Sequence, residues 1–146
     1  SEYRLNQLKN KIKNSDKPQP SLKEDSVFQR KIAALEIELK ALEYTELRTL
    51  AAVSVGKAPG PESSLLKIRG TEIQQHLDEL FMEAAGYFSL PYVPGQYSLE
   101  SNPDNHVGFD ADSVSSLVYF NNRKASIYGG SNEIQKNIIA KHVLGL

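Results

Sequence analysis

The sequence predicts an all-α protein, an antiparallel up-down-up-down arrangement of helices similar to a four-helix bundle. Two observations predict it. Apolar residues recur at spacings of three and four, as Ile32, Leu35 and Leu39 do, and this period is typical of a helix with one buried face. Proline and glycine clusters separate the periodic stretches around residues 18–20 and 56–61. No alternating pattern predicts a strand, so we expect a single helical domain over residues 1–146.

The first expected helix covers Glu2–Lys13, and three apolar residues share one of its faces: Leu5, Leu8 and Ile12. A linker over residues 14–21 follows, because two prolines there cannot continue a helix. The chain has no initiator Met and opens inside a Lys/Leu-patterned helix. We therefore expect the chain to be a fragment or a processed product.

A long second helix is expected over Leu22–Val55, opening with a capping box in which Ser21 and Glu24 satisfy each other's backbone N–H groups. Glu36 and Lys40 form a favourable i,i+4 pair, expected on its outer side. Its apolar stripe is broad. The residues expected to face inward are Ile32, Leu35, Leu39, Leu42 and Leu50, flanked by Ile37, Leu47 and Val53.

A third helix is expected over Pro61–Ala85, with Gly86 as a left-handed terminator. Its inward residues are Leu66, Ile73, Leu77, Leu80, Phe81 and Ala84. Residues 87–112 contain three prolines and two glycines and predict a long irregular loop. A loop of this length inside a compact domain usually has a function, such as covering a groove or a neighbouring subunit.

Two further helices complete the prediction. One covers Ala111–Ser126 and buries Val114, Leu117, Val118 and Tyr119. The last begins after Ser131 as N-cap and ends at Gly145. Its expected inward residues are Ile134, Ile138 and Val143.

Composition excludes several classes of function. Apolar residues make up 40% and charged residues 24% of the chain, and the net charge of −1 gives no electrostatic case for binding nucleic acid. The absence of cysteine excludes disulfides and thiolate sites and is typical of an intracellular protein. The three histidines lack a metal-ligand spacing. No apolar run approaches the ~20 residues that a membrane span requires, and the N-terminus has no signal-peptide core.

The segment Gly129-Gly-Ser-Asn-Glu133 carries the most chemical information. Two glycines before a capped helix expose backbone N–H groups at the positive end of a helix dipole, which favours a phosphate or a carboxylate. Taken alone the motif is weak, since most such turns only punctuate loops.

The last twenty residues are more specific. Their sequence is Ile127-Tyr-Gly-Gly-Ser-Asn-Glu-Ile-Gln-Lys-Asn-Ile-Ile-Ala-Lys-His-Val-Leu-Gly-Leu146. This run resembles the C-terminal signature of the acyl-CoA dehydrogenases. The resemblance continues more loosely upstream, through residues 34–43 and 60–86, and covers roughly residues 22–146. It implies the helical C-terminal domain of that family, with residues 1–13 as the tail of a truncated first helix. The family's N-terminal helical domain and middle β domain are absent from this chain.

The resemblance also implies a function for the parent protein, oxidation of an acyl-CoA to the 2-enoyl-CoA with FAD as cofactor. A carboxylate base would remove the α-proton, with its pKa raised by burial, while hydride passes to the flavin. The partners implied are the acyl-CoA substrate, an electron-transfer flavoprotein-like acceptor, and other subunits in a homo-oligomer or a paired assembly. The implied location is the bacterial cytoplasm or the mitochondrial matrix.

Site residues follow from the resemblance position by position. Many family members have the catalytic glutamate where this chain has Gly129, which cannot act as a base. Gly130, Ser131 and Glu133 match flavin-contacting positions, although Ser131 is equally expected as an ordinary N-cap. Gly86 matches the end of a second flavin segment, which in relatives serves the partner subunit's site, and its alternative role is helix termination.

Two further positions depart from the family pattern. Met82 stands where relatives often carry Gln, which leaves that flavin contact without an amide side chain. The usual Arg-Asp pair upstream of the catalytic position is replaced by Phe120 and Asn121. Some members place the base on the first helix of the bundle instead, in a stretch outside this chain, and we expect it there.

Three functional hypotheses remain open on the sequence. The first is the FAD half-site and assembly domain of an acyl-CoA dehydrogenase, inactive alone. The second is a non-enzymatic helical interaction module descended from such an enzyme, which the glycine at position 129 favours. The third is a paired subunit with a degenerate site. A bundle that lacks most of one helix also exposes an apolar groove, which predicts self-association.

Overall fold

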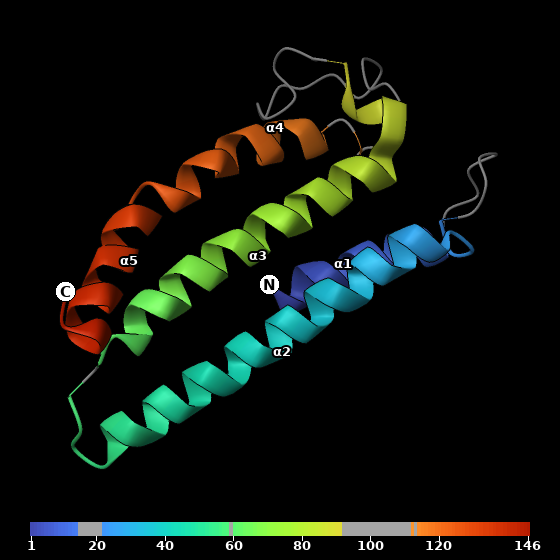
Figure 1. Ribbon diagram of the computed structural model, residues 1–146. Coiled ribbons are helices and arrows are strands. Elements are labelled where there is room, and N and C mark those ends of the chain that lie inside the picture. Colours follow the sequence, from blue (N-terminus) through green and yellow to red (C-terminus); the bar gives the residue numbers. More distant parts are fainter. Residues whose placement is uncertain (15–21, 59, 92–111, 113) are drawn as a thin grey trace, which may run out of the picture.

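The computed structural model describes residues 1–14, 22–58, 60–91, 112 and 114–146 (Figure 1). Throughout these ranges the regular structure is helical, and the prediction of an all-α fold is confirmed. The α-helices are α1 (Glu2–Lys13), α2 (Ser26–Ser54), α3 (Glu62–Ala85), α4 (Val114–Asn122) and α5 (Asn132–Ile139). Shorter turns follow three of them: 3₁₀ turns at Gly86–Ser89 and Arg123–Ser126, and a π-helical turn at Ala140–Leu144.

Helix α3 organises the fold, because it contacts each of the other four α-helices. Figure 1 shows α1 and α2 along one side of α3 and the α4–α5 arm along the other. The direction alternates from α1 to α2, to α3 and to this arm, within which α5 continues in the direction of α4. This is an open, layered packing around one central helix. The prediction of alternating helices therefore holds, whereas the closed four-helix bundle stays a prediction.

The hydrophobic core lies where α1, the first half of α2 and the second half of α3 meet. The predicted apolar faces of α1 and α3 are buried there, and each buried Leu, Ile or Phe side chain contributes roughly 1.5–3 kcal/mol. The core residues are Leu5, Leu8 and Ile12 from α1; Phe28, Ile32 and Leu35 from α2; and Ile73, Leu77, Leu80 and Ala84 from α3.

The predicted apolar stripe of α2 is only partly buried: Leu39 and Leu42 pack against the core, but four of the expected residues do not. Leu50 is 57% exposed, and three other residues of the expected stripe are also exposed: Ile37, Leu47 and Val53. The cause is the length of α1, since Glu2 at its start pairs with Lys40 of α2. Leu47, Leu50 and Val53 lie beyond that level and stay exposed, whereas Ile37 lies before it and is exposed on a side of α2 that does not join the core.

The expected Glu36–Lys40 pair on α2 is also wrong. Lys9 of α1 pairs with Glu36, and Lys40 pairs with Glu43 at 2.7 Å as well as with Glu2. Glu36 thus pairs with α1, and Lys40 pairs both with α1 and, within α2, with a residue three positions along instead of Glu36.

Two helix starts differ from the prediction. Helix α2 begins at Ser26, four residues later than expected, because the Asp25 carboxylate accepts hydrogen bonds from the N–H groups of Val27 (2.8 Å) and Phe28 (3.2 Å). The expected capping residue Ser21 lies outside the described residues. Helix α3 begins at Glu62 rather than Pro61, which takes the N-cap position.

The end of α3 also differs in detail. Gly86 has φ 59° and ψ −135°, so it does require a positive φ, although not in the left-handed helical region that was expected. Of the predicted loop 87–112, residues 92–111 lie outside the described residues, as do residues 15–21 of the predicted linker and Ala111 at the expected start of the fourth helix. Asp112 is described, fully buried, and paired with Lys11.

The C-terminal arm is only partly as predicted. The helix expected over residues 111–126 is divided into α4 and a 3₁₀ turn. Of the residues expected to face inward on the last helix, Ile138 is half-buried, whereas Ile134 and Val143 are exposed, by 53% and 60%. Helix α5 packs on α3 through one side, and a polar residue, Asn132, takes the buried position at its start. Gly145 ends the arm in the left-handed conformation, as predicted.

Candidate functional site

The candidate site is the turn over residues 127–131, which connects the 3₁₀ turn after α4 to α5. Gly129 and Gly130 have φ values of 68° and 81°, in the region that strongly favours glycine, and both are exposed. A Cβ atom at Gly129 would meet no atom within 4 Å, and one at Gly130 would meet only the side-chain amide of Gln135, at 2.7 Å. The turn therefore presents open backbone directly in front of a helix N-terminus.

The N-terminus of α5 is capped as the sequence predicted. Ser131 has extended backbone, and its hydroxyl oxygen accepts from the N–H of Ile134 at 3.4 Å. The pKa of Glu133 is lowered, first by a hydrogen bond from its own backbone N–H and then by one from the Ser131 side chain, with Lys136 and Lys67 adding attraction. A carboxylate with a lowered pKa is a weaker proton acceptor than one with the usual pKa.

Side chains from α3 and α5 hold this turn in place. The Lys67 ammonium group donates to the backbone carbonyl of Ser126 at 3.2 Å and to Oδ1 of Asn132 at 2.8 Å. Thr71, one turn further along α3, donates to the same Asn132 oxygen at 3.4 Å. Gln135 of α5 reaches back to the carbonyl of Gly129 at 3.2 Å. Sequence reasoning missed Lys67 and Asn132, whose roles depend on the packing of α5 against α3.

The two other sequence-predicted site residues lie elsewhere. Met82 and Gly86 are at the C-terminal end of α3, whereas the turn lies beside Lys67 near its start. The helical rise between Lys67 and Met82 is about 22 Å, so the structure does not bring the two groups together. Gly86 is exposed with open space around its Cα, and Met82 is half-buried. The chain thus carries two separate groups of candidate residues, one at each end of α3.

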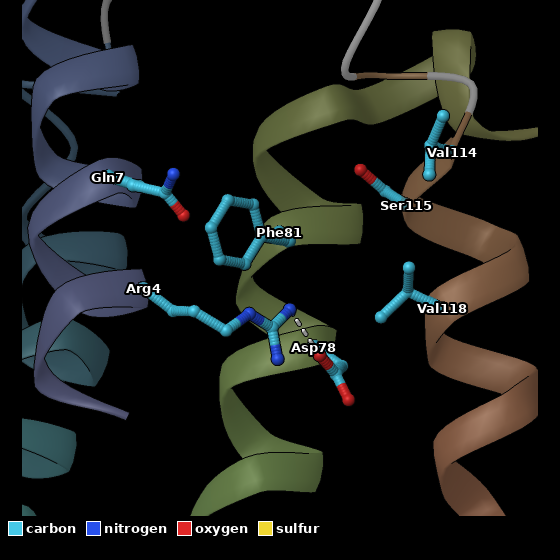
Figure 2. Close-up of a pocket in the computed structure, with 7 residues that line it drawn as sticks. All are labelled: Arg4, Gln7, Asp78, Phe81, Val114, Ser115 and Val118. Carbon is cyan, nitrogen blue, oxygen red and sulfur yellow. Dashed lines mark hydrogen bonds and ion pairs between the residues drawn. The ribbon is translucent and has the colours of Figure 1, made fainter.

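A polar cluster that the sequence did not predict links three helices, and Figure 2 shows it beside a small pocket between α1, α3 and α4. Asp78 of α3 is completely buried and accepts from Arg4 of α1 at 2.6 Å and from Asn122 of α4 at 2.7 Å. The Arg4 guanidinium also lies 5.2 Å from the centre of the Phe81 ring. Both carboxylate oxygens of Asp78 are therefore engaged, which is the arrangement of a structural anchor.

The open backbone of the turn and the N-terminus of α5 together favour an anionic group. FAD carries an anionic pyrophosphate, and exposed backbone at a capped helix N-terminus favours such a group. Within the described ranges, no cluster of three or more His, Asp or Glu side chains is placed to hold a metal ion. None of the helices in the described part of the chain is long and apolar enough to span a membrane.

Comparison with known proteins identifies the family. The chain matches the acyl-CoA dehydrogenase C-terminal domain over residues 4–144. It is 29% identical over 123 residues to acyl-CoA dehydrogenase IpdE1 of Mycobacterium tuberculosis (strain ATCC 25618 / H37Rv), covering 84% of this chain and 28% of that protein. It is 30% identical over 100 residues to IpdE1 of Mycolicibacterium smegmatis, covering 68% of this chain and 22% of that protein.

The chain spans less than a third of the length of either curated relative. No solved structure gives a significant match. The family match covers all five α-helices apart from the first residues of α1, and both relatives carry the family name. The helical fold agrees with the resemblance seen in the residue 127–146 signature. The chain therefore belongs to the acyl-CoA dehydrogenase family and corresponds to its C-terminal helical domain.

Proposed function

We propose that this chain forms an FAD half-site and a subunit-assembly surface of a flavin-dependent acyl-CoA dehydrogenase. The whole protein would oxidise an acyl-CoA thioester to the 2-enoyl-CoA and pass electrons to an electron-transfer flavoprotein-like acceptor. The observation that carries the proposal is the exposed turn 127–131, with its two positive-φ glycines in front of the Ser131-capped helix. Both named relatives are bacterial, which gives the expected mitochondrial location no support.

Different residues of the turn would make the backbone and the side-chain contacts with the cofactor. The backbone at Gly130 and the N–H groups at the start of α5 would face the cofactor, and Ser131 and Glu133 would line it. Bound FAD supplies the hydride acceptor. The chain's own contribution is to fix the cofactor's position relative to the substrate, which lowers the entropic barrier to reaction. Met82 and Gly86, at the other end of α3, would serve the FAD of a partner subunit.

The catalytic base is proposed to lie outside this chain, on the part of the bundle's first helix that precedes Ser1. Gly129 has no side chain, and the lowered pKa of Glu133 argues against its use as a base.

Two glycine substitutions in the full-length protein, made separately, test the half-site. Gly130→Ala places a methyl group on the cofactor-facing turn, and Gly56→Ala is the matched control, because Gly56 also has a positive φ (84°) and lies in the α2–α3 turn. Both changes strain the backbone by about 1–2 kcal/mol, and the Gly130 methyl group also displaces the Gln135 side-chain amide, which its Cβ atom would approach to 2.7 Å. We expect only Gly130→Ala to lose bound flavin, measured from the visible absorption spectrum. Equal flavin content in both variants would contradict the half-site.

A second substitution tests the location of the base. Gly129→Glu in the full-length protein restores the usual family residue at a position with open space around it. If the base lies on the first helix, the unmodified protein is active and the first helix carries a carboxylate that reaches the substrate α-carbon. High activity before any change, with no such carboxylate on that helix, would refute this assignment.

The alternative is a non-catalytic interaction module or a degenerate partner subunit of this family. Gly129, in place of the usual glutamate, is the observation that favours it. A full-length protein that binds no FAD alone, and that stabilises a catalytic partner on co-expression, would establish the paired-subunit form.

A further inference from the structure

Lys67 occupies a position that the proposed function does not yet use. It lies on α3, and its two hydrogen bonds reach opposite ends of the candidate turn: the Ser126 carbonyl just before it and the Asn132 amide oxygen just after it. No other described side chain is recorded as bonded to both ends of the turn. Both acceptors are uncharged oxygens, so these two bonds fix geometry, in addition to the attraction between the Lys67 ammonium group and Glu133.

Hydrogen bonds, rather than buried side chains, hold the turn. The N–H groups of Ile127 and Tyr128 donate to the Lys124 carbonyl, and Gln75 of α3 donates to the Asn122 and Arg123 carbonyls upstream of the turn. Ile127 and Tyr128 are exposed, by 68% and 56%, and both glycines are exposed as well. Without buried apolar contacts, the conformation of a loop depends on its hydrogen bonds. The bond from Gln135 to Gly129 comes from α5 itself, and it therefore cannot fix the turn relative to α3.

Lys67 links the turn to α3 through residues on both sides of it. Hydrogen bonds from a charged donor are shorter and roughly twice as strong as those between neutral groups. Asn132 is buried and also receives the Thr71 hydroxyl, so its acceptor oxygen is held from two turns of α3. The start of α5 is thereby tied to a helix that itself packs against α1, α2 and α4.

We infer that Lys67 is a positioning residue for the flavin half-site: its hydrogen bonds to the residues on either side of the turn 127–131 fix the position of the turn along α3. The inference rests on the proposed function, because the turn is the proposed cofactor contact. Lys67 itself need not touch the cofactor.

The test uses the full-length protein and Lys67→Met, which keeps the length of the side chain but removes its donors. Lys31→Met is the matched control, since Lys31 also ties two helices together, through Glu83 at 2.8 Å, but outside the turn. FAD affinity is measured by titrating the apoprotein, and hydrogen exchange is followed over residues 127–134. We expect Lys67→Met to weaken FAD binding about tenfold or more and to speed exchange in that segment, as loss of charge-assisted hydrogen bonds implies. Lys31→Met should change neither by more than about twofold.

Two further variants distinguish a positioning role of Lys67 from a general loss of stability of the helices around it. Lys67→Arg retains the charge and the donors and should recover part of the affinity, although its planar group cannot reproduce the lysine geometry fully. Asn132→Leu removes the acceptor, and its effect should not add to that of Lys67→Met, because both break one contact. Additive effects, or equally faster exchange along all of α3, would reduce Lys67 to a structural role and overturn the inference.

Failure of the inference and failure of the proposed function are distinguishable. An unmodified protein that binds FAD, with a Lys67→Met variant that binds it equally well, refutes the positioning role alone. An unmodified protein that binds no FAD refutes both the half-site and the role of Lys67 in it.

Discussion

Replacing Arg4 with Met removes the cation from the buried cluster that joins α1, α3 and α4. The Asp78 side chain is 0% exposed, so the carboxylate left behind would retain only the amide of Asn122 as a recorded partner. Removing one member of a buried ion pair costs about 3–5 kcal/mol. The lost contact between the guanidinium and the Phe81 ring adds roughly 0.5–1 kcal/mol. We therefore expect Arg4→Met to destabilise the chain by about 4 kcal/mol, measured by urea denaturation with far-ultraviolet circular dichroism.

The reverse substitution should cost less. In Asp78→Leu the remaining charge belongs to Arg4, whose side chain is already 33% exposed and can turn toward water. The main penalty is the unpaired Asn122 amide, about 1–3 kcal/mol, offset in part by the added apolar burial. The double variant Arg4→Met/Asp78→Leu buries no charge and should be more stable than Arg4→Met alone, since apolar replacement of a buried pair is often near neutral.

The stability of the three variants tests whether the cost of Arg4→Met comes from leaving the Asp78 carboxylate buried without its cation. A loss below about 1 kcal/mol in Arg4→Met, or a double variant whose loss equals the sum of the two single losses, would refute it. Lys40→Met serves as the control, because Lys40 and its partner Glu43 are both exposed. Such a surface pair contributes at most about 1 kcal/mol.

Three other predictions follow from the fold. Phe28→Ala should cost about 3–5 kcal/mol in urea denaturation, because the ring is fully buried, whereas the exposed Tyr3→Ala should stay within about 0.5 kcal/mol. Ser131→Ala should cost about 1 kcal/mol and move the Glu133 pKa upward toward its usual value of 4.5, as followed by NMR titration. Since the folded-state pKa of Glu133 is lowered, its stabilising contribution is present at neutral pH and is lost as the pH falls through that lowered value, and Ser131→Ala should weaken this dependence. Leu50→Glu should reduce self-association of the chain in sedimentation, because it places a charge on the exposed apolar part of α2; a clean monomer at high concentration before substitution would contradict this.

Local sequence patterns were sufficient to predict the buried faces of two helices, one helix cap and the glycine turn. The apolar period of α1 and α3 predicted which faces are buried, and the serine before α5 predicted its cap. The glycines at positions 129 and 130 predicted a turn that only glycine adopts readily, because positive φ is a local property of the backbone. The long match over residues 127–146 also indicated the family, which the comparison confirms.

Only the tertiary structure decided which apolar residues lose contact with water. Leu50 and Ile134 satisfy the same helical period as Leu35, yet they are exposed, because burial requires a partner helix and periodicity alone does not supply one. The same holds for the polar contacts between helices. Lys67 and Asp78 carry no local signal in the sequence, and their roles arise from the way α3 packs against α4 and α5. Sequence thus determined the local turns, caps and family, whereas packing determined the anchors and the exposed faces, since these depend on residues far apart in the chain.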